Sequence, residues 1–212
     1  MATQEQSETL KRISIPGRMA LAAVCFEIAC EHLGVSEPVI FDVIAYFWRF
    51  TTSTSLDVWE GELPEPALAI SQLMGSRLWQ IAILDEKNRE MLLDTGAEYL
   101  RTARKQKGLS HQKQLLVGRA SELLKLPLLV LVMIETIWQG IGCGNFYAGT
   151  DDYSEVTHSA TIRALDCLEV LGIPPPDQAV FQQFRFGSGW GTATGVQPTR
   201  SYLRERLNLT QR

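Results

Sequence analysis

Apolar residues recur at helical spacing along most of the chain. Between Gly17 and Leu33 they cover a wide stripe, which predicts a largely buried first helix that ends at Gly34. Ser36 and Pro38 are typical of a helix start, so a second helix is predicted to follow at once. Its apolar face comprises Val39, Ile40, Val43, Ile44, Phe47 and Trp48.

Helical spacing returns in the rest of the chain. Residues 67–84, 88–107 and 114–125 each predict a helix. A further helix is predicted from about residue 153 to 171, because Gly172 and the three prolines that follow Ile173 stop it. Residues 202–209 predict a last short helix.

The apolar run Leu128–Trp138 is too short for its periodicity to distinguish a buried helix from a strand. No second strand-like run exists to pair with it, so we favour a helix. Loops are predicted at residues 51–55 and 140–144 from their composition.

Residues 177–191 change to aromatics and glycines, including the segment Phe181–Phe186 and the run Gly187–Gly191. This pattern indicates an irregular segment that pins the end of the chain to the core. Residues 1–14 are predicted to be a flexible leader. The sequence therefore predicts an all-α fold: a single compact domain, residues 15–212, of about seven or eight helices.

Composition narrows the classes of function. Apolar residues make up 45% of the chain and charged residues 21%, which is ordinary for a soluble globular protein. A formal net charge of −4 gives no general electrostatic reason to bind nucleic acid or anionic lipid. The start shows no apolar core of a signal peptide, and the run 126–134 is less than half a bilayer span. We expect a soluble, cytoplasmic protein that makes no use of a membrane.

The four cysteines have neither the spacing nor the density of a disulfide scaffold, so free thiols in a reducing compartment are expected. They are Cys25, Cys30, Cys143 and Cys167.

The acidic connector of residues 56–65 is the candidate for partner binding. Here Trp59 is surrounded by four carboxylates, and an aromatic anchor ringed by carboxylates suits a partner with a basic face. The alternative is a surface loop whose indole packs back into the core. The candidate residues are Asp57, Trp59, Glu60, Glu62 and Glu65.

Three residues could carry chemistry in the alternative interpretation. Glu155 and His158 have the Glu-x-x-His spacing that metal-carboxylate bundles use, and Cys143 lies between two glycines. The metal motif has no second copy, and Asp152 with Glu155 fits a helix-start cap instead. We expect no catalytic residue, metal ligand or cofactor.

A basic cluster is present before the middle of the chain, and it is continued by His111 and Lys113. Nearby aromatics are almost absent, and the end of a helix favours basic residues, so nucleic-acid binding is not expected. The cluster comprises Arg101, Arg104, Lys105 and Lys107.

Three segments carry a resemblance to a family. The order Arg18-Met-Ala-Leu to Phe26, then Phe41–Phe50, and the late Phe184–Gly191 resemble helical bacterial proteins of the toxin-immunity type. The resemblance implies a small, cytoplasmic, non-enzymatic protein that binds a cognate toxin and blocks its active site. It implies no site residues, because such proteins share none that can be transferred.

Two hypotheses follow for the function. The first is a non-enzymatic immunity protein that binds a protein toxin with a basic face. The alternative is a helical enzyme, or a sensor of small molecules or metals, that uses Glu155, His158 and Cys143. The alternative predicts that these three side chains converge beside a cavity.

Overall fold

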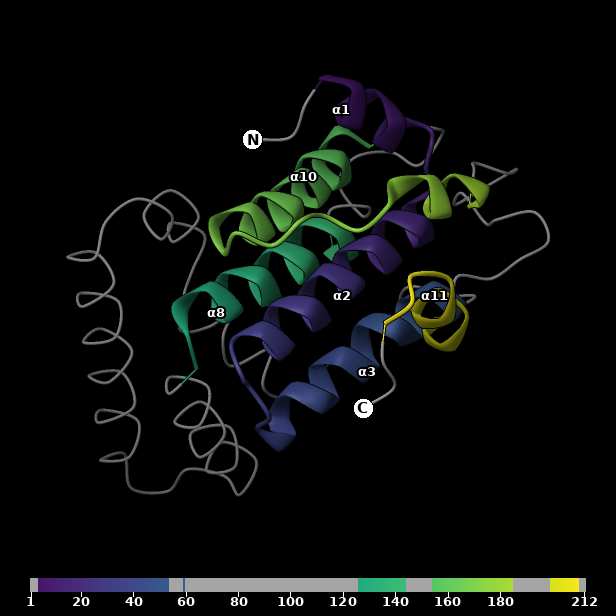
Figure 1. Cartoon of the computed structure of the whole chain (residues 1–212). Helices are drawn as coiled ribbons and strands as arrows, with labels where there is room; N and C mark the ends of the chain where they lie inside the picture. Colours follow the sequence, from purple (N-terminus) through teal and green to yellow (C-terminus); the bar gives the residue numbers. More distant parts are fainter. Residues whose placement is uncertain (1–3, 54–58, 60–125, 144–153, 185–198, 210–212) are drawn as a thin grey trace, which may run out of the picture.

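The computed structural model describes residues 4–53, 59, 126–143, 154–184 and 199–209, and within these ranges the chain is helical and contains no strand (Figure 1). The predicted all-α fold is confirmed, and the run after Pro127 is a helix. None of the helices in these ranges is long and apolar enough to span a membrane. The elements are α1 (Gln4–Lys11), α2 (Ile15–His32), α3 (Pro38–Thr52), α8 (Leu128–Glu135), the π-helix η2 (Thr136–Cys143), α10 (Glu155–Val170), the 3-10 helix η3 (Gln178–Gln183) and α11 (Arg200–Arg206).

Helix α2 is the centre of the fold. Every residue from Gly17 to Glu27 is buried, because α3 packs on one side of α2 while α8, η2 and α10 cover the other (Figure 1). A helix that is apolar all round needs such complete cover. Burying each large apolar side chain along it stabilises the fold by about 1.5–3 kcal/mol.

Both ends of α2 are capped, and the end at Gly34 is the one that the sequence predicts. At its start the Ser14 hydroxyl accepts a hydrogen bond from the Gly17 amide, and Pro16 stands in the first turn. At its end Gly34 has φ +67°, and the amides of Gly34 and Val35 donate to the carbonyls of Glu31 and Cys30. This is a Schellman ending, which a residue with a side chain would strain.

Residues 4–14 pack on the helical domain, which corrects the prediction of a flexible leader for this part of residues 1–14. Residues 4–11 form α1, and the side chains of Leu10 and Ile13 are fully buried. A leader was predicted because this stretch is polar. The stretch nevertheless packs on the domain through Leu10 and Ile13, and α1 contacts α10 and η3.

The predicted loop at residues 140–144 is wrong for the described residues up to Cys143, which continue α8 as the π-helix η2. Glycines are suited to η2 because the side chains of Ala160 and Trp59 pack closely against its backbone. A Cβ placed on Gly140 would lie 2.4 Å from the Cβ of Ala160. One placed on Gly142 would lie 2.3 Å from the ring of Trp59.

The segment after α10 holds the chain end to the core, as predicted. Phe181 and Phe184 are fully buried, and their ring centroids lie 6.4 Å apart. The Phe184 carbonyl accepts a hydrogen bond from the Ser14 amide at 2.7 Å, so this segment locks the start of α2. Tyr202 of α11 packs edge-on against Phe184. The glycine run 187–191 lies outside the described residues.

Candidate functional site

The candidate site is a hollow at the C-terminal end of α10. Gly172 has φ +69° and ends the helix, and the amides of Gly172 and Ile173 donate to the carbonyls of Glu169 and Leu168. This Schellman ending turns the chain sharply, so the prolines that follow run back beside the helix and enclose a space of about 410 Å³. The residues that line it are Gln6, Leu165, Asp166, Glu169, Gly172, Ile173, Pro174 and Pro175.

The rim of this hollow is acidic and its surroundings are apolar. Among the described residues that line it, Asp166 and Glu169 carry charge and none is basic. Val170, the last residue of α10, does not line the hollow but is 70% exposed, the largest exposure of any large apolar side chain in the described ranges. Exposed apolar surface beside carboxylates is a common composition for a surface that binds protein.

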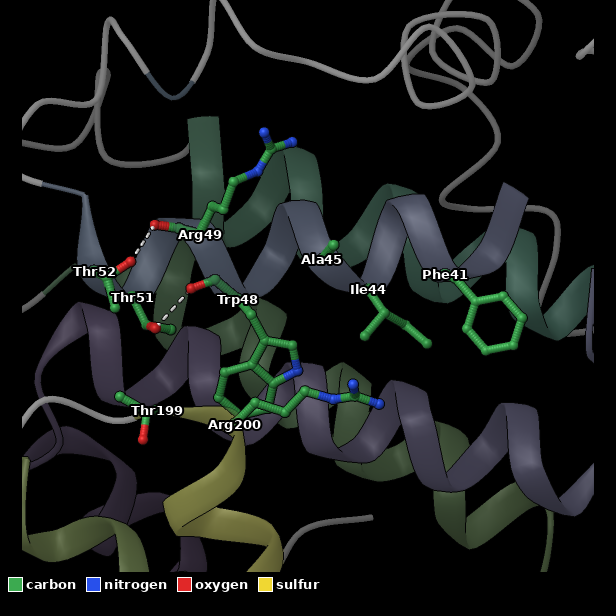
Figure 2. Close-up of a pocket in the computed structure, with 9 residues that line it drawn as sticks. All are labelled: Phe41, Ile44, Ala45, Trp48, Arg49, Thr51, Thr52, Thr199 and Arg200. Carbon is green, nitrogen blue, oxygen red and sulfur yellow. Dashed lines mark hydrogen bonds between the residues drawn. The ribbon is translucent and has the colours of Figure 1, made fainter. Parts of the chain in front are cut away.

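A second hollow lies between α3 and the start of α11 (Figure 2). Phe41, 58% exposed, stands at one end of it, and Arg49 and Arg200 stand towards the other. In Figure 2 the side chains of Ile44 and Trp48 point from α3 toward Arg200. Its volume is about 380 Å³.

The acidic connector is described only at Trp59. That indole is 1% exposed, stacks on Tyr46 with ring centroids 4.4 Å apart, and donates from Nε1 to the Tyr46 carbonyl. Trp59 therefore lies in the core and is not an exposed anchor, which corrects its assignment as a partner-binding residue. Its apolar ring is held by Tyr46, Phe50 and Gly142. Asp57, Glu60, Glu62 and Glu65 lie outside the described residues, as does the basic cluster 101–107.

None of the three hollows lined by described residues brings Glu155, His158 and Cys143 together. A hollow of about 440 Å³ beside the start of α10 includes Glu155, but neither His158 nor Cys143 is among the described residues that line it. The helix cap is formed by Ser154, whose hydroxyl accepts from the Thr157 amide, and not by the predicted Asp152. Within the described ranges, no group of three or more His, Cys, Asp or Glu side chains is placed to hold a metal ion.

His158 serves the packing of α1. Its Nε2 lies 3.0 Å from the Ser7 carbonyl oxygen and 3.3 Å from the Ser7 hydroxyl. Burial lowers the pKa of His158, and the nearby positive charges of Arg18 and Lys11 act in the same direction. The contacts of this imidazole with Ser7 join α10 to α1.

The four cysteines are free and buried, as predicted. Burial raises the pKa of Cys30 and of Cys167 to about 12, and it raises the pKa of Cys25 as well. A thiol with a raised pKa holds almost no thiolate at neutral pH, so these three are poor nucleophiles.

No protein-family model matches this sequence, and no curated protein and no solved structure is similar to it.

Sequence patterns did not identify either hollow. A signal for each was nevertheless present. Val170 follows Glu169 on the polar side of its helix, and Phe41 lies off the apolar face predicted for α3. A single apolar residue on a polar face is only a weak signal, because isolated exposed apolar residues are common and contiguous patches are what mark a binding surface. The prolines after Gly172 were interpreted only as a helix stop.

Proposed function

We propose that this chain is a non-enzymatic protein-binding protein of the immunity type, which acts in the cytoplasm by binding a cognate bacterial toxin. The observation that carries the proposal is the 70% exposure of Val170 at the end of α10, the same end of the helix at which the acid-rimmed hollow lies. The resemblance of three sequence segments to toxin-immunity proteins supports the class of partner.

The chemistry of the hollow suits a protein surface that carries lysine or arginine. Pro174 and Pro175 of the hollow offer apolar contact, and Asp166 and Glu169 offer carboxylates beside them. Val170, exposed at the same end of α10, offers a further apolar contact. Carboxylates around an apolar patch speed the approach of a basic partner and select against acidic ones. If the active-site cleft of the toxin is basic, the residues around that cleft would bind to this acidic surface. The bound chain would then block the cleft sterically.

This surface replaces the one predicted from sequence. The sequence predicts a binding surface in which an apolar side chain, Trp59, is surrounded by carboxylates. Because Trp59 is in the core, its indole supports the fold, and the C-terminal end of α10 supplies the same combination of groups.

The test is purification of the tagged chain from the organism that encodes it, with Val170→Asp and Asp166→Lys/Glu169→Lys compared with the wild type. Val156→Asp is the matched control, because Val156 is also exposed, 47%, but lies at the opposite end of α10. We expect one stoichiometric partner that resembles a toxin domain, retained by Val156→Asp and lost by the other two. Equal recovery with all variants would remove the hollow from the proposal, and no partner at all would remove the binding function.

A further inference from the structure

The exposed face of α3 has a symmetric order of groups about Ala45. Phe41 lies four residues before Ala45 and Arg49 four residues after it, and all three are exposed. At about 1.5 Å of rise per residue, Phe41 and Arg49 stand about 6 Å on either side of Ala45 along the helix. Figure 2 shows the three in this order along α3.

The rotation of the helix divides this face into two edges. At about 100° per residue, Phe41 and Trp48 lie about 40° and 60° to one side of Ala45. Arg49 and Asp42 lie about 40° and 60° to the other side. One edge therefore carries the aromatic groups of the hollow, and the opposite edge carries an acid near one end and a base near the other.

We propose that a second copy of this chain binds to this face, with the two α3 helices antiparallel and Ala45 near the two-fold axis. The two-fold axis is perpendicular to both helices and lies in the plane of the contact. The aromatic edge of one copy therefore faces the aromatic edge of the other, and the two helices run in opposite directions. Asp42 of each copy then stands opposite Arg49 of the other copy, about 1.5 Å apart in height by the helical rise. Like every isologous contact, each pair occurs twice.

The aromatic edge is complementary in the same arrangement. Phe41 of each copy reaches the height of Trp48 of the other, where the hollow is lined by Ile44, Trp48, Thr52 and Arg200. Phe41 would enter this space and lose its 58% exposure. The guanidinium of Arg200, whose side chain is 45% exposed, lies at the rim and can face the entering ring.

Two features make close approach possible. Ala45 at the crossing point has the smallest side chain of the exposed face, so the two backbones can meet at the usual 8–10 Å between helix axes. The side chains of Trp48 and Arg200, which line the hollow, are already held in place before a second copy binds, because Glu27 accepts hydrogen bonds from Trp48 Nε1 and from the guanidinium of Arg200. Binding therefore costs little ordering of these two side chains.

The contact is modest in size. Helix α3 has 15 residues, which is about 22 Å of helix, and such a face falls toward the low end of the range for specific interfaces. We expect a reversible dimer with a dissociation constant on the order of 10 µM that weakens as salt rises.

The test is sedimentation equilibrium and light scattering of the full chain between about 1 and 200 µM, a range that brackets this constant. Phe41→Asp, Asp42→Arg and Arg49→Asp should each raise the dissociation constant by about tenfold or more, because each removes a contact that occurs twice. Val156→Asp, on α10 and outside this face of α3, should leave the dissociation constant unchanged. Thermal unfolding checks that each variant is folded, and Arg49→Gln and Asp42→Asn replace any that is not.

The most direct experiment mixes the Asp42→Arg and Arg49→Asp variants. An Asp42→Arg copy meets like charges in its own dimer, and so does an Arg49→Asp copy. In a mixed pair both contacts join opposite charges, so native mass spectrometry of the mixture should show a 1:1 heterodimer that neither variant forms with itself. A wild type that stays monomeric to the highest concentration, a dimer indifferent to Phe41→Asp, or a mixture that fails to pair would each overturn the proposal.

Discussion

The carboxylate of Glu27 accepts a hydrogen bond from Nη1 of Arg204 at 2.6 Å, although the two residues are 177 positions apart in the sequence. Both side chains are buried, at 3% and 7% exposure. The same carboxylate accepts from Trp48 Nε1 and from Arg200, so one acid on α2 ties α3 and α11 to the centre of the fold.

Replacing Glu27 by Gln should lower the free energy of unfolding by about 3 kcal/mol, because two arginines lose the charge that they pair with and one of them is buried. Urea unfolding followed by tryptophan fluorescence measures the change. Glu31→Gln is the control: Glu31 also pairs with Arg204 but is 42% exposed, and its loss should cost about 0–1 kcal/mol. Equal effects of the two substitutions would contradict the assigned role of Glu27.

Gly142 should not tolerate a side chain. A Cβ there meets the Trp59 ring at 2.3 Å, so Gly142→Ala should cost about 1–3 kcal/mol through overpacking. Trp59→Phe removes part of the ring and also the hydrogen bond to Tyr46. If the clash is with Trp59, the double variant will be less destabilised than the sum of the two single ones in chemical unfolding. Additive costs would show that Gly142 is constrained by something else.

Glu135 should make stability depend on pH. Burial raises the pKa of Glu135 to about 7, and its Oε2 has no hydrogen-bond partner among the described residues. Because the folded pKa lies above the ordinary 4.5, the stabilisation by the neutral acid is complete below about pH 4.5 and is lost as the pH rises through 7. Glu135→Gln should therefore be near neutral at pH 4.5 and should stabilise by roughly 2–3 kcal/mol at pH 8. Thermal unfolding of the wild type and of Glu135→Gln between pH 4.5 and pH 8 measures this difference. A difference in stability that does not change with pH would refute the prediction.

Arg18 should be needed for the docking of α1. Its fully buried guanidinium donates to the carbonyls of Leu10 and Lys11 at the end of α1, and to the carbonyl of Ser154 and the hydroxyl of Thr157 on α10. Arg18→Met should leave buried carbonyls unpaired and cost about 2–4 kcal/mol. Hydrogen exchange should rise most in α1 and in the first turn of α10. Exchange that rises evenly over the whole fold would show that Arg18 does not hold α1 in particular.

Local pattern was sufficient to predict α2, α3 and α10, because their periodicity and stop residues such as Gly34 and Gly172 specify them. The helix α8 was predicted only because no second strand-like run exists to pair with it. It failed where the partner is distant in sequence. The glycines of η2 look like a loop until Ala160 and Trp59 are known to pack on them.

The surfaces were harder to predict than the helices for the same reason. Trp59 among carboxylates looks exposed when only its neighbours in sequence are considered, and it is buried because Tyr46 and Phe50 cover it. The acid-rimmed hollow joins Gln6 to residues 165–175, and no local pattern connects these.

The central claim is that the chain neutralises a toxin through the hollow at the end of α10. The direct measurement is growth of a host that expresses, one at a time, the toxin domains encoded by the same organism, together with this chain. We predict that the wild type and Val156→Asp restore growth against one toxin, and that Val170→Asp and Asp166→Lys/Glu169→Lys do not, although all four accumulate as folded protein. Growth restored against none of the toxins would contradict the immunity function, and rescue by all four proteins would contradict the site.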